Sequence, residues 1–125
     1  LNNRTEESLG SSEDFWTAFR EHVFTCNQSP WLGYLIVVGK DKESTHAVKV
    51  SEPHFPVRAE FKNSTYLDRY RILCQRLVLE HKYNAVALIA TENKDSYENL
   101  AENLSIDTFI NSFRGHLLGF ADEFR

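Results

Sequence analysis

Apolar positions recur with helical spacing in three parts of the chain and form short continuous runs in two others. In the first part, the side chains that share one helical face are Phe15, Phe19, His22, Val23 and Cys26. This spacing predicts an amphipathic helix from Ser12 to Thr25, which could begin as early as Thr5. Ser11 is its expected N-cap, with Asp14 reaching back in a capping box.

Two continuous apolar runs predict strands, and a helix is predicted between them. Leu32 to Val38 is rich in branched and aromatic residues, which favours a strand covered on both faces. Ala85 to Ala90 predicts a second buried strand. From Ser64, its expected N-cap, to His81, apolar residues line one side of a helix. A strand, a crossover with a helix and a second strand are typical of a parallel pair with a right-handed connection.

The remaining segments are a long irregular stretch and a C-terminal helix. Lys40 to Asn63 has no clear period, although a hairpin could pair Ala47–Val50 with Val57–Phe61. Ser105 is the expected N-cap of the last helix. Its predicted apolar face carries Ile106, Phe109, Ile110, Phe113, Leu117, Phe120, Ala121 and Phe124. Because two strands do not make an independent sheet covered on both faces, we expect half of an α/β domain, with further strands upstream.

Composition narrows the class of protein only modestly. The chain has 125 residues and a formal net charge of −4, which argues mildly against a general electrostatic attraction to nucleic acid. No apolar run approaches the ~20 residues that span a bilayer, so we expect no contact with a membrane. Cys26 and Cys74 both fall on predicted apolar helix faces, which suits buried, reduced thiols in a cytoplasmic protein.

The sharpest local signal for chemistry is Glu60-Phe61-Lys62. On a strand, Glu-x-Lys places both side chains on one face, about 7 Å apart. With an aspartate on a neighbouring strand it can hold Mg²⁺ near a phosphodiester, and Asp41 is the only well-placed upstream aspartate. Glu-x-Lys is common by chance, so the residues alone favour a solvated charged pair.

The histidines carry less information than their number suggests. His22 and His81 lie on predicted apolar helix faces, which favours packing over metal binding. His46 and His54 lie in the irregular stretch, with a spacing that matches no zinc motif. His54, between a proline and a phenylalanine, could equally be a rigid recognition element.

Two basic regions could contact phosphates. The irregular stretch carries Lys49, Arg58 and Lys62, and it is either a phosphate-binding loop or an ordinary polar loop. In the following helix, Arg69 and Arg76 lie two turns apart on one face, where they could follow a nucleic-acid backbone. A solvated helix face is the simpler interpretation, because acidic neighbours partly neutralise these arginines. An apolar strip of Ile72 and Leu79 runs beside them.

Several stretches, taken in order, resemble the XhoI family of type II restriction endonucleases. They are Asn2 to Glu7, Asp14 to Glu21, Pro53 to Val57 leading into Glu60-Phe61-Lys62, Tyr66 to Glu80, and Ala85 to Ala90. The first two resemble the helix that follows that family's catalytic strand, and the next two resemble a later loop and helix. The resemblance runs from Asn2 to about Ala90 and does not extend past Thr91.

This resemblance implies a PD-(D/E)xK nuclease with a restriction-endonuclease-like α/β/α fold. It also implies Mg²⁺-dependent cleavage of double-stranded DNA by a homodimer, at a palindromic site of the CTCGAG type. In the family, the catalytic aspartate and Glu-x-Lys precede the stretch that Asn2 to Glu7 resembles, so we expect them upstream of Leu1. Residues 1–125 are then a single-domain C-terminal fragment without catalytic residues or bound Mg²⁺, and inactive when isolated.

Two hypotheses about function therefore stay open. In the first, the chain is part of a cytoplasmic restriction enzyme and supplies surfaces for DNA contact or dimerisation. The candidate DNA-binding residues are His54, Arg58, Lys62, Arg69 and Arg76. In the second, the chain is a non-enzymatic α/β interaction or regulatory domain derived from such a nuclease.

Overall fold

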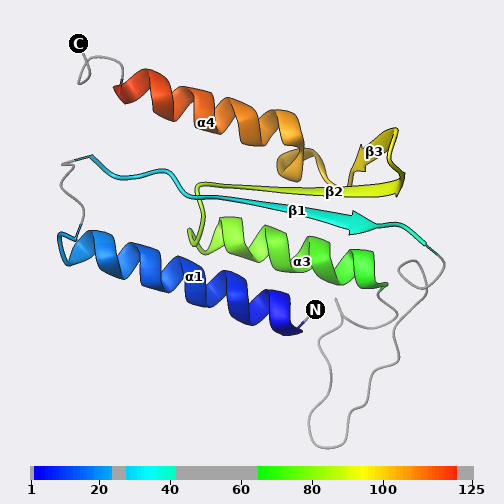
Figure 1. Cartoon of the computed structure of the whole chain (residues 1–125), viewed down its shortest axis with the longest axis horizontal. Coiled ribbons are helices and arrows are strands. Elements are labelled where there is room, and N and C mark those ends of the chain that lie inside the picture. Colours follow the sequence, from blue (N-terminus) through cyan, green and yellow to red (C-terminus); the bar gives the residue numbers. More distant parts are fainter. Residues whose placement is uncertain (1, 24–27, 42–64, 121–125) are drawn as a thin grey trace, which may run out of the picture.

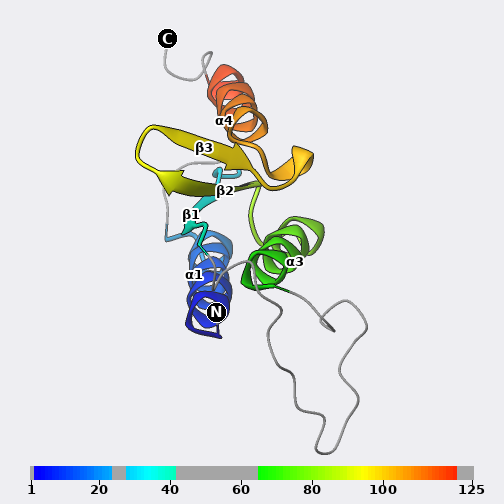
Figure 2. The same ribbon diagram turned by 90° about the vertical axis from the view of Figure 1, so that its right-hand side faces the viewer.

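A computed structural model of the chain describes residues 2–23, 28–41 and 65–120. Its elements, in chain order, are α1 (Asn2–Arg20), β1 (Gly33–Gly39), α3 (Tyr66–Leu79), β2 (Ala85–Asn93), β3 (Ser96–Asn99), the 3₁₀ helix η2 (Glu102–Leu104) and α4 (Ile106–Phe120). Figure 1 shows three layers, with α1 and α3 on one side of the sheet and α4 on the other. The turned view in Figure 2 shows α1 and α3 lying side by side beneath the strands. The molecule is therefore α/β, as expected for a restriction-endonuclease-like fold.

The sheet confirms the predicted parallel pair. β1 and β2 are parallel neighbours, in register from Gly33 opposite Ala85 to Gly39 opposite Thr91. The strand order is β1-β2-β3, so β1 forms one edge of the sheet among the described residues.

β3 was not predicted from the sequence. It pairs with β2 in the antiparallel direction through a short hairpin. The Asn93 side chain holds the hairpin turn, because its Oδ1 accepts hydrogen bonds from the Asp95 amide at 2.9 Å and the Ser96 hydroxyl at 3.2 Å. The β3 residues are exposed and polar, so they lack the apolar alternation that marks a strand in a sequence.

The core lies where α3, β1 and β2 meet. Its buried members are Ile36, Cys74, Leu77, Tyr83, Val86, Leu88 and Leu104. Cys74 is fully buried, as predicted. Desolvation raises the pKa of its thiol to about 12, so this thiol stays protonated at neutral pH.

Within the part of the chain that the structure describes, β1 is well covered on only one face, which corrects the prediction that both faces are covered. Tyr34, Ile36 and Val38 pack into or against the core on the α1 and α3 side. Leu35 and Val37, on the alternate face, are 48% and 58% exposed. The sequence could not reveal this difference, because a continuous apolar run does not indicate which face has a neighbour.

The first helix begins and ends earlier than predicted. α1 is continuous from Asn2, so Ser11 is an exposed residue of the helix interior and not its N-cap. The helix ends at Arg20, whereas we predicted Thr25. Tertiary hydrogen bonds at the buried Ser8 and Ser12, described below, stabilise the polar first half of this helix.

α1 and α3 end in the same way, and this corrects the predicted positions of two histidines. His22 and His81 adopt left-handed backbone conformations, with φ of 58° and 56°, and both are exposed beyond the helix ends. At the end of α3, the Lys82 amide donates to the Leu77 carbonyl and the His81 amide donates to the Val78 carbonyl, each at 3.0 Å. This is a Schellman motif, which ends a helix by satisfying its last carbonyls.

The predicted caps are right for one helix and wrong for another. Ser105 caps α4, since its hydroxyl accepts the Thr108 amide hydrogen at 3.1 Å. The N-cap of α3 is Thr65, with Asp68 completing the capping box, and not Ser64. Several features predicted from the sequence lie outside the described residues. They are the hairpin, the Glu60-Phe61-Lys62 motif, His46, His54 and Cys26. Among the described helices, none has the length and apolar character needed to cross a membrane.

Candidate nucleic-acid interface

The two arginines proposed to face DNA lie on α3 and are partly withdrawn from solvent. Arg69 and Arg76 are half-buried, and each already interacts with other groups of the chain. Arg71 is exposed instead, and its guanidinium lies 3.3 Å from an Asp68 carboxylate oxygen. The helix thus presents a basic surface whose cations are largely engaged within the molecule.

The apolar strip beside these arginines is exposed mainly at its C-terminal end. Ile72 is half-buried, whereas Leu79 is 76% exposed at the end of α3. The other candidate DNA-binding residues, His54, Arg58 and Lys62, lie outside the described residues. The structure therefore places only Arg69 and Arg76 of the predicted set, and both lie in one helix.

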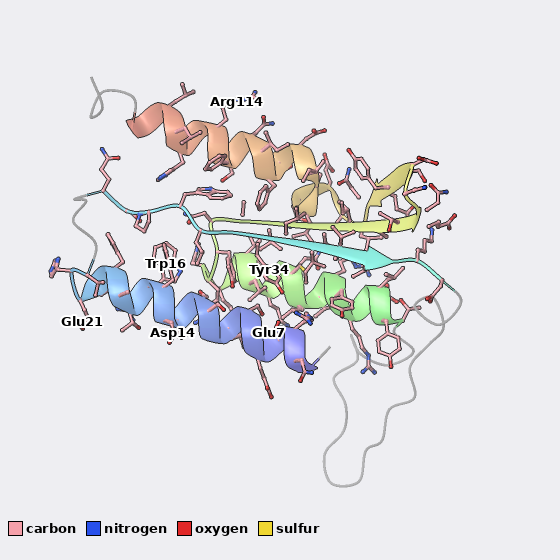
Figure 3. All side chains as sticks on the ribbon, viewed as in Figure 1. Glu7, Asp14, Trp16, Glu21, Tyr34 and Arg114 are labelled. Carbon is pink, nitrogen blue, oxygen red and sulfur yellow. The ribbon has the colours of Figure 1, made fainter. Side chains whose placement is uncertain are left out.

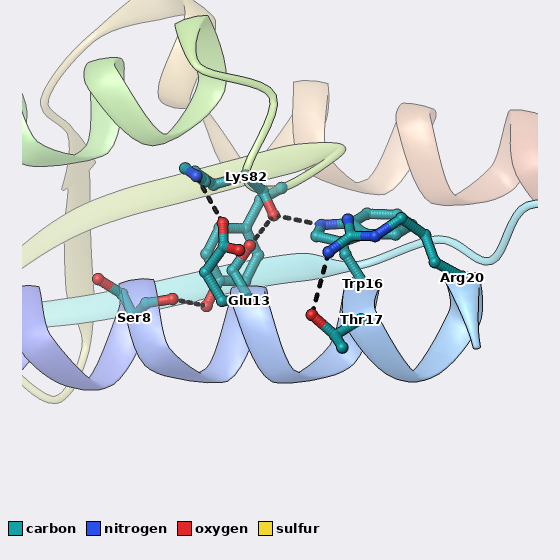
Figure 4. A network of polar contacts seen from close by, with 8 residues as sticks. Ser8, Glu13, Trp16, Thr17, Arg20 and Lys82 are labelled. Carbon is teal, nitrogen blue, oxygen red and sulfur yellow. Dashed lines mark hydrogen bonds and ion pairs between the residues drawn. The ribbon is translucent and has the colours of Figure 1, made fainter. Parts of the chain in front are cut away.

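Helix α1 is attached to the turn after α3 by two hydrogen bonds to one backbone carbonyl. The Ser12 hydroxyl and the Trp16 indole both donate to the carbonyl oxygen of Lys82, at 2.6 and 2.9 Å. Figure 4 shows the Trp16 indole directed at the Lys82 carbonyl. One turn earlier along α1, the buried Tyr83 hydroxyl donates to the Ser8 carbonyl at 2.8 Å.

An ion pair lies at the solvent-exposed side of the contact between α1 and the turn after α3. The Lys82 ammonium lies 2.6 Å from a Glu13 carboxylate oxygen. This hydrogen bond and charge lower the pKa of Glu13 and raise the pKa of Lys82. Because both side chains reach solvent, the pair orients the helix more than it stabilises the fold.

These contacts explain part of the sequence that carries the family resemblance. In the stretch from Asp14 to Glu21, Trp16 points toward the sheet, whereas Asp14 and Glu21 are exposed (Figure 3). Trp16 also packs edge-on against Phe15 and Phe19, with ring centroids 5.4 and 6.4 Å away. This stretch therefore holds α1 in place, and sequence reasoning missed the roles of its partners, since they are separated from it by more than sixty residues.

A surface cavity of about 400 Å³ adjoins this contact. Its lining residues are Glu13, Trp16, Arg20, Glu80, His81, Lys82 and Asn84. Acidic and basic groups alternate around it, and Lys82 is already paired with Glu13. The cavity thus shows no preference for an anion or a cation.

A second charged cluster, not predicted from the sequence, lies at the carboxyl ends of β1 and β2. The Lys40 ammonium lies 2.9 Å from Glu98 and 3.9 Å from Glu92. The parallel register brings the residue after β1 beside the end of β2, which is where ligands of α/β sheets often bind. Here the lysine offsets one of the two carboxylate charges and ties the β2–β3 hairpin to the end of β1. No group of three or more potential metal ligands occurs among the described residues.

The mixed three-stranded sheet with helices on both faces is consistent with a restriction-endonuclease-like α/β fold. The family model of restriction endonuclease XhoI matches residues 1–102, and the chain belongs to that family. This confirms the resemblance on which the first hypothesis rests. The match also extends past Thr91, where the sequence analysis found no resemblance.

Two curated relatives show how much of such a protein the chain covers. Type II restriction enzyme BstVI of Geobacillus stearothermophilus is 45% identical over 121 residues, which is 94% of this chain and 54% of the relative. Type II restriction enzyme XhoI of Xanthomonas vasicola is 44% identical over 80 residues, which is 64% of this chain and 32% of the relative. No solved structure matches the chain significantly. The chain thus spans about half of BstVI and a third of XhoI.

Proposed function

We propose that this chain is part of a type II restriction endonuclease that cleaves double-stranded DNA at a palindromic site of the CTCGAG type. The observation that carries the proposal is the family match over residues 1–102, supported by 45% identity to BstVI. The whole enzyme acts as a homodimer in the cytoplasm, in restriction-modification defence. This chain supplies part of its core sheet together with surfaces for DNA contact or dimerisation.

Phosphodiester cleavage by this class needs a divalent metal ion, for which Mg²⁺ is the proposed cofactor. The described residues do not fit a site for it, because no three carboxylate, histidine or cysteine side chains converge. Because the family resemblance puts the catalytic aspartate and Glu-x-Lys before the stretch that Asn2 to Glu7 resembles, we place the metal-binding residues in the part of the family polypeptide that this chain does not match. The chain by itself should not cleave DNA.

Contact with DNA is proposed for the segment that precedes α3 in the sequence and for α3 itself. The proposed residues are His54, Arg58, Lys62, Arg69 and Arg76. Since Arg69 and Arg76 are half-buried and already engaged, the larger share of the phosphate contacts falls to Arg58 and Lys62. Arg69 and Arg76 would then contribute positive charge beside those contacts.

A chimeric enzyme tests this function directly. In the chimera, this chain replaces the matched part of BstVI, and the product is incubated with Mg²⁺ and a plasmid that carries one candidate site. We expect cleavage at a single position by the chimera and none by the chain alone. A correctly folded chimera that binds DNA but never cuts it would contradict the proposal.

Binding measured at several salt concentrations tests the proposed contact residues. Arg58→Gln and Lys62→Gln should each weaken binding on every sequence and reduce the slope of log K against log salt by roughly 0.9 per lost contact. The matched control is Arg114→Gln, because Arg114 is exposed on α4, on the far side of the sheet from α1 and α3 (Figure 3). Unchanged affinity and slope in both variants would place the DNA-binding surface elsewhere.

The alternative function, a non-enzymatic interaction domain, is favoured by one observation. Leu35 and Val37 expose an apolar sheet face that suits a protein partner. The chimera separates the two functions, since a non-enzymatic interaction domain derived from a nuclease would not restore cleavage.

A further inference from the structure

One flank of α4 carries an apolar stripe that the described residues leave largely open to solvent. Its members recur with the alternating four- and three-residue spacing of a helix seam, and we call them the α4 stripe: Ile106, Ile110, Phe113 and Leu117. Ile110, Phe113 and Leu117 are 44%, 43% and 52% exposed. Scattered apolar residues are ordinary on a protein surface, whereas a row of them along one helix indicates an interaction surface.

The α4 stripe is distinct from the side by which α4 packs on the rest of the molecule. Phe109 lies edge-on against Trp31, with ring centroids 5.2 Å apart, and the Trp31 indole donates a hydrogen bond to the Ser112 hydroxyl at 2.9 Å. Together with the half-buried His116, Phe109 and Ser112 form the inward side of the helix. Phe113 lies at the border between the two sides, because its ring also contacts Trp31.

Two opposite charges follow the other edge of the stripe. Asp107 and Arg114 are seven residues apart, so they lie nearly two turns apart along the same edge. Both are exposed, and Arg114 lies on the side of α4 away from the sheet (Figure 3). Neither forms an ion pair with another residue that the structure describes. A helix that pairs with the α4 stripe therefore fits best if it carries the same two charges in the reverse order.

An antiparallel copy of α4 matches the apolar stripe to itself. Rotation about a two-fold axis perpendicular to the helix reverses its direction, so that each contact occurs twice. If Ile110 lies opposite Phe113 of the second copy, then Leu117 lies opposite Ile106 of that copy, because both pairs are centred between residues 111 and 112. Each large side chain of the stripe then meets another apolar side chain.

The same register matches the charges. The two-fold rotation brings the edge that carries Asp107 and Arg114 against the equivalent edge of the second copy. In the register set by the apolar residues, Asp107 comes within two residues of the level of Arg114 of the second copy, which is about 3 Å along the helix axis. In a parallel pair, this edge would instead meet the edge next to Phe109 and His116, which is turned toward the rest of the molecule. Apolar and charged residues therefore favour the same antiparallel arrangement.

We propose that the α4 stripe is a contact between two copies of this chain, paired as antiparallel helices about a two-fold axis between residues 111 and 112. The inference deepens the proposed function, on which it rests for the expectation of a homodimer, by assigning the surface that forms it. A second copy supplies the reversed order of charges by symmetry, which favours it over an unrelated partner. The stripe is smaller than the roughly 800 Å² that each partner of a stable interface buries, so we expect this chain alone to dimerise weakly and reversibly.

Charge reversal tests the pairing and its register. In Asp107→Arg both edge residues are cationic, and in Arg114→Asp both are anionic. Each variant should self-associate at least about tenfold more weakly than the unchanged chain, because like charges then face each other. A mixture of the two variants should form a heterodimer with an affinity within about threefold of the original dimer. Sedimentation equilibrium measures these affinities, and circular dichroism checks that each variant is folded.

Changes within and beside the stripe separate it from the rest of α4. Leu117→Asp should weaken the dimer at least about tenfold. Leu118→Asp is the matched control, because Leu118 is 70% exposed on the same helix but lies outside the stripe, and it should leave the affinity within about twofold. Arg114→Gln removes an attraction without adding a repulsion, so it should weaken the dimer by at most about fivefold.

Disulfide trapping extends the test to the chimera with BstVI. In a Cys26→Ser background, Ile106→Cys combined with Leu117→Cys should give a covalent dimer under mild oxidation, because the two positions oppose each other across the proposed contact. Within one helix they are about 16 Å apart, too far for a bridge inside one copy. Asp107→Cys combined with Leu118→Cys is the matched control, with the same separation outside the stripe, and it should trap at least about tenfold less dimer.

Several outcomes overturn the inference. They are equal trapping by the two cysteine pairs, a dimer that both charge reversals leave unchanged, and a chain and chimera that both stay monomeric at the highest concentration measured. If the chimera does not fold, trapping in this chain alone decides the question. None of these readouts requires DNA or cleavage, so a chimera that dimerises through α4 and never cuts contradicts the proposed function alone.

Discussion

Removing both hydrogen-bond donors to the Lys82 carbonyl should lower the free energy of unfolding by more than the sum of the two single changes. Ser12 is fully buried and donates to this oxygen at 2.6 Å, and Trp16 donates at 2.9 Å. In Ser12→Ala or Trp16→Phe, the carbonyl keeps one partner. In the double variant this partly buried carbonyl loses both the Ser12 and the Trp16 donor.

The expected losses of stability follow from the fact that Ser12 and Trp16 share one acceptor. Loss of one hydrogen bond whose acceptor stays satisfied costs about 0.5–1.5 kcal/mol, whereas a buried polar group left without a partner costs about 1–3 kcal/mol. Trp16→Phe also removes part of the edge-on packing against Phe15 and Phe19. We therefore expect each single variant to lose about 1–2 kcal/mol, and the double variant to lose about 1 kcal/mol more than their sum.

Urea unfolding followed by circular dichroism measures this coupling through a double-mutant cycle. Ser11→Ala is the matched control, because Ser11 is the exposed neighbour of Ser12 in α1 and the change alters helix propensity equally. The cycle requires unchanged m-values, so that the denatured state is the same throughout. A coupling energy below about 0.3 kcal/mol would show that the shared carbonyl does not link α1 to the turn after α3.

Three further predictions test the close packing at Gly33, the burial of Cys74 and the pH response of the Glu13–Lys82 pair. Gly33→Ala should destabilise the fold by about 1–3 kcal/mol, because the new Cβ would lie 2.2 Å from a carbon of the Trp31 indole. Gly39→Ala is the control, because a Cβ at Gly39 meets open space. The midpoints of urea unfolding compare the two variants. In a Cys26→Ser background, the buried Cys74 thiol should react with a disulfide reagent only as fast as the protein unfolds, and prompt reaction in the native state would contradict its burial. The lysine-bound Glu13 carboxylate has a pKa lowered from 4.5, so its contribution is present above that pH and is lost as pH falls through the lowered value. Glu13→Gln should therefore flatten the acid side of the stability profile, and an unchanged profile would exclude this role.

Only part of the candidate site could be read from the sequence. Helical spacing alone puts Arg69 and Arg76 on one side of α3, because seven residues make nearly two turns. Their partial burial depends on what lies against that side, which no local pattern encodes. The cluster of Lys40, Glu92 and Glu98 likewise forms only when the strand register brings distant residues together.

The sequence by itself determined the elements whose cause is local. Continuous branched and apolar runs predicted β1 and β2, the length of the helical crossover predicted that they are parallel, and Ser105 marked the start of α4. The family could also be recognised from ordered motifs, and the match over residues 1–102 confirms it.

Tertiary structure alone decided the extent of α1 and the coverage of β1. The first half of α1 has no apolar stripe, and it is stabilised by a hydrogen bond to the Ser8 carbonyl from the hydroxyl of Tyr83, 75 residues further along the chain. Leu35 is as apolar as its buried neighbour Ile36, yet it faces the α4 side of the sheet, where α4 packs on β2 and leaves Leu35 48% exposed. Apolar character is a property of one residue, whereas burial needs a neighbour that arrives from elsewhere in the chain, and for this reason the pattern predicted the strand but not its exposed face.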